Sequence, residues 1–129
     1  MSSAYLGQIL LVGAGGFIGS SLRFVISSWA QRSEFVAGFP LGTLVVNVIG
    51  CLLIGVLGGI AEHRQLLEPG QRLFLAVGVL GGFTTFSAFA FETVSLLQAA
   101  DVGRAILNVF AQITLGCLAA LLGYLAVAR

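Results

Sequence analysis

The chain has 129 residues, of which 58% are hydrophobic and 9% are charged, with a net charge of +1 and a mean hydropathy of +1.07. Soluble domains carry about 25% charged residues, so this composition excludes an ordinary soluble protein and indicates an integral membrane protein. With so few basic residues, we expect no nucleic-acid partner.

Long charge-free runs divide the chain into candidate membrane spans, each near or above the about 20 residues that a spanning helix requires. These runs are 2–22, 35–61, 73–91 and 105–128. The polar links between them lie at 32–34, 62–72 and 101–104. We therefore expect a single transmembrane domain over residues 1–129, with approximate helices at 4–30, 40–62, 71–98 and 102–128.

The first run has no basic residues before it and is longer than the apolar core of a secretory signal. We therefore expect it to remain as a helix. Gly15 and Gly19 have the small-xxx-small spacing that lets membrane helices approach closely, as do Gly55 and Gly59 in the second run. Such glycine faces are typical of tight helix packing and of association between copies.

In the second run, Thr43 and Asn47 stand four residues apart and place two hydrogen-bond donors on one helix face. An intramembrane Asn often only joins helices. Next to the features of the third run, it is a candidate for a polar track. Cys51 and Cys117 lie in apolar runs without partners at ligand spacing, which indicates packing residues rather than a disulfide or a zinc site.

The third run is interrupted by the segment Gly-Gly-Phe-Thr-Thr-Phe-Ser-Ala-Phe at 81–89. Glycine weakens a helix by about 1 kcal/mol relative to alanine. Hydrocarbon offers no water to loosened backbone groups, so a break at this depth must be buried in protein or line a wet cavity. Unwound backbone in transporters coordinates ions. We interpret this break as the centre of an ion pathway; a Gly/Thr kink that only shapes packing is the alternative.

Directly after the break, Phe86 and Phe89 share one helix face. The edge of an aromatic ring carries positive potential, so paired ring edges suit an anion, although phenylalanines in membrane helices often only face lipid. The hydroxyls of Thr85 and Ser87 add donors beside the rings. These residues become pathway candidates because they adjoin the break.

Two charged residues lie within or near the spans. Glu92 ends the third run, and a carboxylate at a helix centre costs about 2.5–3.5 kcal/mol on insertion scales, so it should face protein or water. Arg23 ends the glycine-rich face of the first helix, where its charge would concentrate anions in a vestibule. For both residues the alternative is a side chain that reaches the membrane surface.

The fourth run carries Asn108 and Gln112 four residues apart, which predicts one polar stripe, whereas Thr114 falls on another face. The candidate pathway therefore includes side chains from three spans. They are Phe86, Phe89, Asn47, Ser87, Thr85, Asn108, Gln112, Thr114 and Glu92.

The arginines do not fix the orientation of the chain in the membrane. Four spans place both termini and the middle link on one side, with Arg64, Arg72 and Arg129. The other side holds Arg23, Arg32 and Arg104. Because basic residues normally set orientation, this balance favours insertion both ways and pairing of opposite copies. The alternative is an orientation set by the first helix.

Three motifs, at 16–24, 42–50 and 81–89 with Glu92 downstream, closely resemble the bacterial Fluc family of small fluoride channels. The resemblance spans essentially the whole chain. It implies an all-α membrane protein of four transmembrane helices with a broken third helix. It further implies an antiparallel dual-topology homodimer in the bacterial inner membrane that passively exports cytoplasmic fluoride.

The resemblance also implies roles for individual residues. Phe86 and Phe89 would be the pore rings, Asn47 an amide that contacts fluoride, and Arg23 a vestibule residue. The backbone carbonyls of Gly81 and Thr84 would hold a structural sodium ion (Na+) on the dimer axis. Two departures from the family pattern affect the pathway. Ala88 replaces a common hydroxyl residue, and the polar residues of the fourth helix match the family only loosely.

Two other classes compete with a fluoride channel, and none of the three is an enzyme. A proton-coupled four-helix exporter of small cations would be expected to carry an essential carboxylate in its first helix, where this chain has none. Glu92 is then the only candidate. A membrane assembly subunit would transport nothing.

Overall fold

The computed structural model describes residues 2–32, 38–63 and 66–128. Residues 33–34 of the first predicted link, Arg64 and Arg129 lie outside this part. The helical elements are α1 (Ser3–Gln31), α2 (Leu41–His63), α3 (Pro69–Arg72), the π-helical segment η2 (Leu73–Leu80), α4 (Gly81–Phe83), α5 (Phe86–Gln98) and α6 (Val102–Val127).

Four helical stretches are long and apolar enough to cross a membrane, and one of them is interrupted. They are Ser3–Gln31, Leu41–His63, Pro69–Gln98 and Val102–Val127. The interruption lies at Thr84 and Thr85, whose backbones are extended, with ψ of 159° and φ of −152° respectively. The prediction of an all-α membrane protein with four spans and a broken third helix is confirmed.

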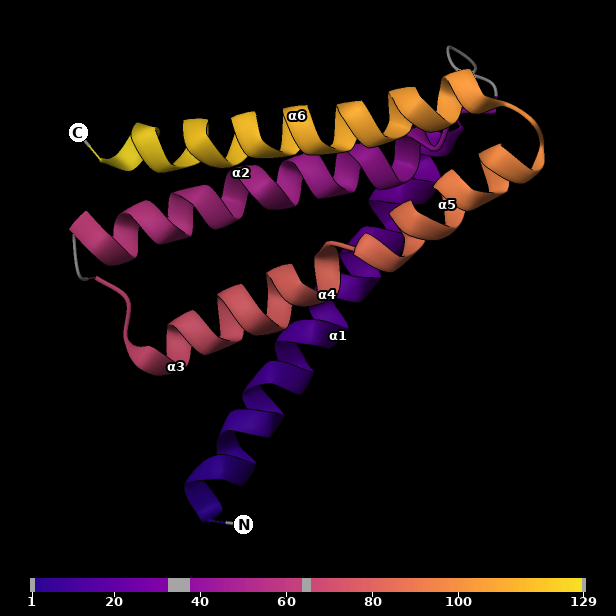
Figure 1. The fold of residues 1–129 in the computed structure, drawn as a ribbon. Coiled ribbons are helices and arrows are strands. Elements are labelled where there is room, and N and C mark those ends of the chain that lie inside the picture. The colour runs from indigo at the N-terminus through magenta and orange to yellow at the C-terminus, as the bar shows by residue number, and fades with distance from the viewer. Residues whose placement is uncertain (1, 33–37, 64–65, 129) are drawn as a thin grey trace.

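The spans pack as two pairs joined around the break (Figure 1). Helices α2 and α6 lie side by side, while α1 packs against η2 and α4. After the break, α5 runs toward the start of α6. This arrangement brings the middle of α2, the break and the middle of α6 together.

Glycines allow both helix pairs to approach closely. A Cβ atom on Gly15 would lie 2.6 Å from the carbonyl oxygen of Phe74, and one on Gly19 would overlap the carbonyl oxygen of Val79. On α2, a Cβ atom on Gly55 would overlap the carbonyl oxygen of Ala120 in α6. The small-xxx-small motifs of α1 and α2 therefore pack helices of the same chain.

Replacing Gly19 with alanine is expected to lower the free energy of unfolding by roughly 1–3 kcal/mol, because overpacking forces the backbones of α1 and η2 apart. Gly13→Ala on the same helix is the matched control, since nothing lies within 4 Å of a Cβ atom there. That control should leave stability unchanged or raise it. Denaturation in detergent measures both, and equal stability of the two variants would contradict the proposed contact.

A side chain at the end of α1 sets the start of α2. The Gln31 side chain donates from Nε2 to the carbonyl of Phe39 at 3.0 Å, and its Oε1 accepts the Gly42 amide at 3.1 Å. The orphan amide at the N-terminus of α2 is thereby satisfied. This contact fixes the beginning of the helix that carries Thr43 and Asn47.

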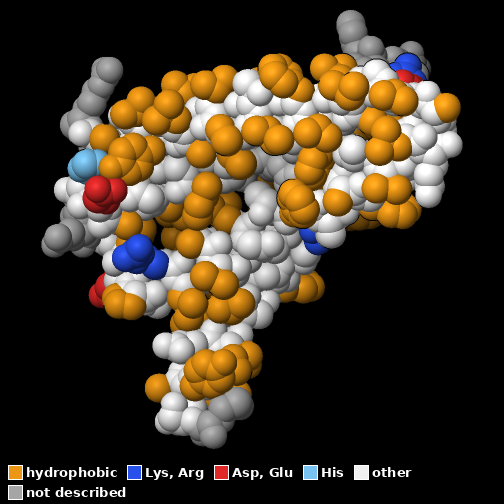
Figure 2. Space-filling view, in the orientation of Figure 1, with side chains coloured by type: hydrophobic (Ala, Val, Ile, Leu, Met, Phe, Trp, Pro, Cys, Tyr) orange, Lys and Arg blue, Asp and Glu red, His pale blue; other side chains and the backbone are white. Residues whose placement is uncertain are grey.

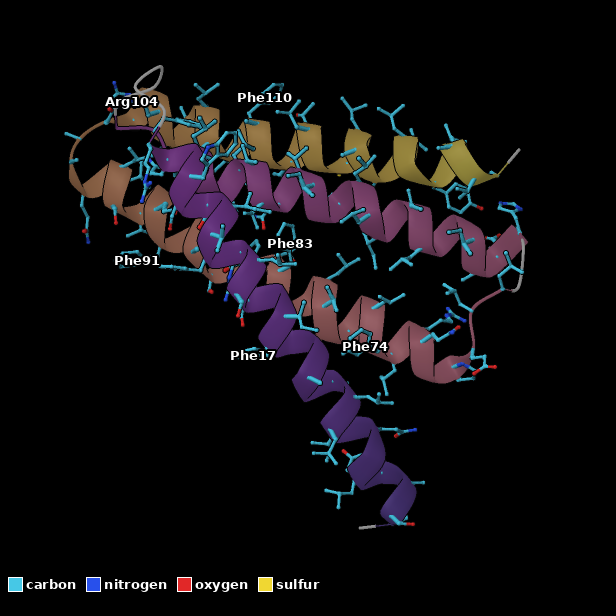
Figure 3. The ribbon with its side chains drawn as sticks, turned by 180° about the vertical axis from the view of Figure 1, so that it is seen from behind. Phe17, Phe74, Phe83, Phe91, Arg104 and Phe110 are labelled. Carbon is cyan, nitrogen blue, oxygen red and sulfur yellow. The ribbon has the colours of Figure 1, made fainter. Side chains whose placement is uncertain are left out.

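The surface is mostly apolar, as a bilayer requires. Hydrophobic side chains cover the visible face, and most charged side chains in view lie toward the ends of the molecule (Figure 2). Phe17, Phe91 and Phe110 point outward, whereas Phe83 lies among the helices with 4% of its surface exposed (Figure 3). Such a surface suits lipid contact and contact with further copies of the chain.

Candidate functional site

The break is held by the side chain of Asn47 from α2. Asn47 Oδ1 accepts the Thr85 amide at 2.8 Å, and Nδ2 donates to the Thr85 carbonyl at 3.0 Å. One carboxamide thus satisfies both backbone groups of the residue at which the helix is interrupted. Because unpaired backbone groups at membrane depth are costly, this contact stabilises the non-helical conformation.

A second carboxamide joins the same cluster from α6. Asn47 Nδ2 also donates to Oε1 of Gln112 at 3.1 Å. The two amides lie on a cavity of about 390 Å³ that opens beside the break. The residues that line this cavity are Asn47, Gly50, Cys51, Ile54, Ala76, Leu80, Gly81, Thr84, Thr85, Phe86, Phe89, Gln112 and Ile113.

Phe86 and Phe89 form an edge-to-face pair at this cavity. Their ring centroids are 5.4 Å apart and their planes meet at 65°. Phe89 is partly buried, whereas Phe86 is 78% exposed in a single copy of the chain. The structure thus brings the predicted ring pair together with the predicted amide of Asn47.

The hydroxyl residues beside the rings begin the second half of the broken helix. Thr85 is the N-cap of α5, and its Oγ1 accepts the Ala88 amide at 3.1 Å. The hydroxyls of Thr85 and Ser87 are 3.2 Å apart. Ser87 is exposed and Thr85 partly buried, so the two hydroxyls continue from the cavity to the surface of the single copy.

Two backbone carbonyls at the break are released from helical hydrogen bonding. In a continuous α-helix, the carbonyls of Gly81 and Thr84 would accept from the amides of Thr85 and Ala88. Here the Thr85 amide binds Asn47 and the Ala88 amide binds the Thr85 hydroxyl. Carbonyl oxygens are ligands that hard cations prefer, so the residues fit the predicted sodium site.

Arg23 and Glu92 lie on a second cavity, of about 340 Å³, together with Thr43 and Thr85. Thr43 Oγ1 donates to Glu92 Oε1 at 2.6 Å. Within the described residues, the buried Glu92 Oε2 has no hydrogen-bond partner. An arginine and a glutamate therefore share a partly polar cavity that Thr85 also lines.

Asn108 and Thr114 lie away from the cavity of the ring pair. Asn108 is fully buried, and its Nδ2 donates to Thr93 Oγ1 at 3.0 Å. The Thr93 hydroxyl in turn donates to the carbonyl of Phe89 at 2.8 Å. Thr114 lines an apolar groove with Phe110 and Ile113. The structure thus connects Asn108 to the backbone of a ring residue and separates Thr114 from the amide cluster.

Thr93 is a residue that the sequence reasoning missed. Its place four residues after Phe89, on the turn that faces α6, is the only signal that would have identified it. The hydrogen bond between Thr43 and Glu92, which joins α2 and α5, was also not predicted. Neither partner predicts the other, because the contact depends on how α2 and α5 cross.

Replacing Thr93 with valine is expected to lower the free energy of unfolding by about 1–3 kcal/mol, because the Asn108 amide loses its buried acceptor. Ser95→Ala is the matched control. Its hydroxyl makes the same kind of bond, to the Phe91 carbonyl at 2.9 Å, but on an exposed face. That change should stay within about 0.5 kcal/mol. Denaturation in detergent measures both, and a Thr93→Val protein as stable as Ser95→Ala would contradict the role of the chain of bonds.

These features define a class: a small, four-span membrane protein with a largely apolar cavity at a helix break, on which two side-chain amides lie. Residues 10–124 match the family described as CrcB-like protein, Camphor Resistance (CrcB). The chain is 50% identical over 117 residues to a protein of Thermus thermophilus named fluoride-specific ion channel FluC, with 91% of each chain covered.

Two further relatives carry related names. A fluoride-specific ion channel FluC of Methylobacillus flagellatus is 44% identical over 117 residues, covering 91% of each chain. The fluoride-specific ion channel FluC 1 of Methanosarcina acetivorans is 42% identical over 115 residues, covering 89% of this chain and 86% of the relative. The chain belongs to the CrcB-like family, and the family predicted from its motifs is confirmed.

Proposed function

We propose that the protein is a passive channel through which fluoride leaves the cytoplasm across the bacterial cell membrane. The observation that carries the proposal is the cavity at the break, where the Asn47 and Gln112 amides meet the edge-to-face pair of Phe86 and Phe89. The names of the relatives support fluoride as the ion. The cavity is neither charged nor built for covalent chemistry, which suits conduction.

Conduction proceeds by exchange of water for protein donors. Fluoride is small and strongly hydrated, so it enters only where N–H and O–H groups and positive ring edges replace its water shell. The cavity supplies amide donors, the hydroxyl of Thr85 and the ring edges of Phe86 and Phe89. Uncharged donors keep the affinity low enough for the ion to leave, as permeation requires.

The pathway is completed by a second, inverted copy of the chain. The single copy leaves the irregular backbone of Thr84 and Thr85 partly exposed, and the flanking Gly81, Phe86 and Ser87 exposed. Irregular backbone does not face lipid, so protein must cover this surface. The balanced arginines on the two sides of the membrane favour a copy of opposite orientation. The proposed assembly is therefore an antiparallel homodimer joined at the broken span.

A sodium ion would join the two copies on the axis of this dimer. The released carbonyls of Gly81 and Thr84 from each copy would hold it. Its charge would compensate the carbonyl dipoles that the break leaves unpaired. Replacing sodium with a large organic cation is then expected to weaken the dimer, which size-exclusion chromatography detects.

Liposome efflux followed with a fluoride electrode tests the proposed function. We expect the reconstituted protein to release fluoride from loaded liposomes and to leave chloride inside. The variant Glu92→Gln separates a channel from a proton-coupled exporter. A channel that carries this substitution should retain measurable fluoride flux, whereas an exporter should lose its transport activity. Absence of fluoride flux in the unmodified protein would reject the proposal.

A further inference from the structure

Helix α2 presents a notch to the first residue of the break. Gly50 is buried, and a Cβ atom on it would overlap Cγ2 of Thr84. The same Cβ atom would lie 3.4 Å from Cδ1 of Phe83, which is an ordinary contact distance. The side-chain methyl group of Thr84 therefore fills the space that a side chain at position 50 would occupy.

The hydroxyl group of Thr84 keeps this methyl group in place. Thr84 Oγ1 donates to the carbonyl of Leu80 at 2.9 Å, and the Thr84 amide donates to the same carbonyl at 3.0 Å. With the hydroxyl turned back to the preceding helical turn, the methyl group faces Gly50. The side chain is thus held by a hydrogen bond within its own span and by contact with α2.

The contact affects the ion site because Thr84 and Thr85 share one peptide group. A peptide group is planar, so the carbonyl of Thr84 and the amide of Thr85 point in opposite directions within one plane. Asn47 Oδ1 fixes the Thr85 amide at 2.8 Å, and the notch at Gly50 fixes the Thr84 end of the plane. Two contacts from α2, about one helical turn apart, therefore set the direction of the released Thr84 carbonyl.

We infer that Gly50 is a positioning residue for the Thr84 carbonyl, and that the lack of a side chain at position 50 sets the affinity of the break for its cation. This inference rests on the proposed sodium ion, since it names what holds one of its ligands. Metal sites tolerate changes of only about 0.2 Å in ligand distance. A methyl group on residue 50 would displace Thr84 by more than that, because carbon atoms in contact stay about 3.5–4.0 Å apart.

The sodium dependence of unfolding tests the inference without measuring transport. In detergent, the unfolding temperature of the unmodified protein should rise as sodium chloride replaces N-methyl-D-glucamine chloride. The sodium concentration that produces half of this rise reports the affinity of the site. In Gly50→Ala, that concentration should increase at least about tenfold, because the Thr84 carbonyl of each copy is displaced.

Moving the methyl group from one helix to the other gives a sharper test. Thr84→Ser removes Cγ2 but keeps the hydroxyl that binds Leu80, so Gly50→Ala combined with Thr84→Ser refills the notch from α2. The sodium concentration of half-effect in this double variant should lie within about threefold of the unmodified value, because the two changes compensate each other. If Gly50→Ala alone does not fold, the double variant should restore both folding and the sodium response.

Gly55→Ala is the control for a packing defect on the same helix. A Cβ atom there would overlap the carbonyl oxygen of Ala120 in α6, so this variant should be less stable but keep the unmodified sodium concentration of half-effect. An unchanged concentration in Gly50→Ala, an equal increase in Gly55→Ala, or a double variant no better than Gly50→Ala would overturn the inference. No response to sodium in the unmodified protein would overturn the sodium site and the inference together. A normal sodium response without fluoride flux would instead reject only the proposed channel.

Discussion

Replacing either Phe86 or Phe89 with isoleucine is expected to suppress fluoride efflux about tenfold. The pathway would lose one ring edge, and the remaining ring would lose the edge-to-face contact that orients it. The edge-to-face geometry, with centroids 5.4 Å apart, depends on both rings. Isoleucine keeps the apolar bulk, so the proposed dimer should remain intact. Efflux from liposomes measures the first property and size-exclusion chromatography the second.

The matched control for the ring pair is Phe91→Ile. Phe91 lies on the same helix, points outward (Figure 3) and is 74% exposed, and it is not among the residues that line the cavity of the ring pair. It should therefore conduct like the unmodified protein. Near-normal efflux in both Phe86→Ile and Phe89→Ile would remove the rings from the pathway. A comparable loss in Phe91→Ile would indicate a general effect on folding.

Replacing Asn47 with alanine is expected to reduce both stability and fluoride efflux. The Thr85 amide and carbonyl lose their side-chain partners, which should lower the free energy of unfolding by roughly 1–3 kcal/mol. Gln112 also loses the donor that orients it. Fluoride efflux should fall together with stability, because the Asn47 side chain both holds the break and lines the cavity.

Asn47→Asp provides a second comparison at the same position. An aspartate retains an acceptor for the Thr85 amide but cannot donate to the Thr85 carbonyl or to Gln112. Because its carboxylate would face these two oxygen atoms within a membrane span, its stability should be no higher than that of the alanine variant. Denaturation in detergent and efflux from liposomes measure both effects. Unchanged stability and flux in Asn47→Ala would reduce Asn47 to an incidental contact between helices.

The architecture was predictable because the bilayer leaves few choices. Four apolar runs must become helices, and a Gly-Gly-Phe-Thr-Thr segment within one of them weakens the helix at a definite place. The structure places the interruption at Thr84 and Thr85, inside that segment. The η2 segment before it was not predicted, since a π-helical turn depends on the packing against α1 as well as on local sequence.

The contacts within the site were less predictable, because they join residues far apart in the chain. Asn47 meets Thr85 and Gln112 across 38 and 65 positions. A polar residue on an apolar helix signals that it needs a partner, but it does not say which one. The glycines behave in the same way: their spacing predicted close approach, and the fold decided that α1 meets η2 and α2 meets α6.

The fourth span shows the same limit within one helix. Its spacing predicted a polar stripe of Asn108 and Gln112, with Thr114 on another face. In the structure Gln112 lies on the cavity at the break, whereas the buried Asn108 binds Thr93. Asn108 and Gln112 are one turn apart but make different contacts, because Gln112 meets α2 and Asn108 meets α5.

Current across a planar bilayer tests the central claim most directly. With fluoride at different concentrations on the two sides, and chloride and pH equal, a passive fluoride pathway predicts a current that reverses at the fluoride equilibrium potential. Imposing a chloride gradient instead should leave the reversal potential at zero. A reversal potential that follows chloride, protons or the cation, or the absence of any current, would contradict the account.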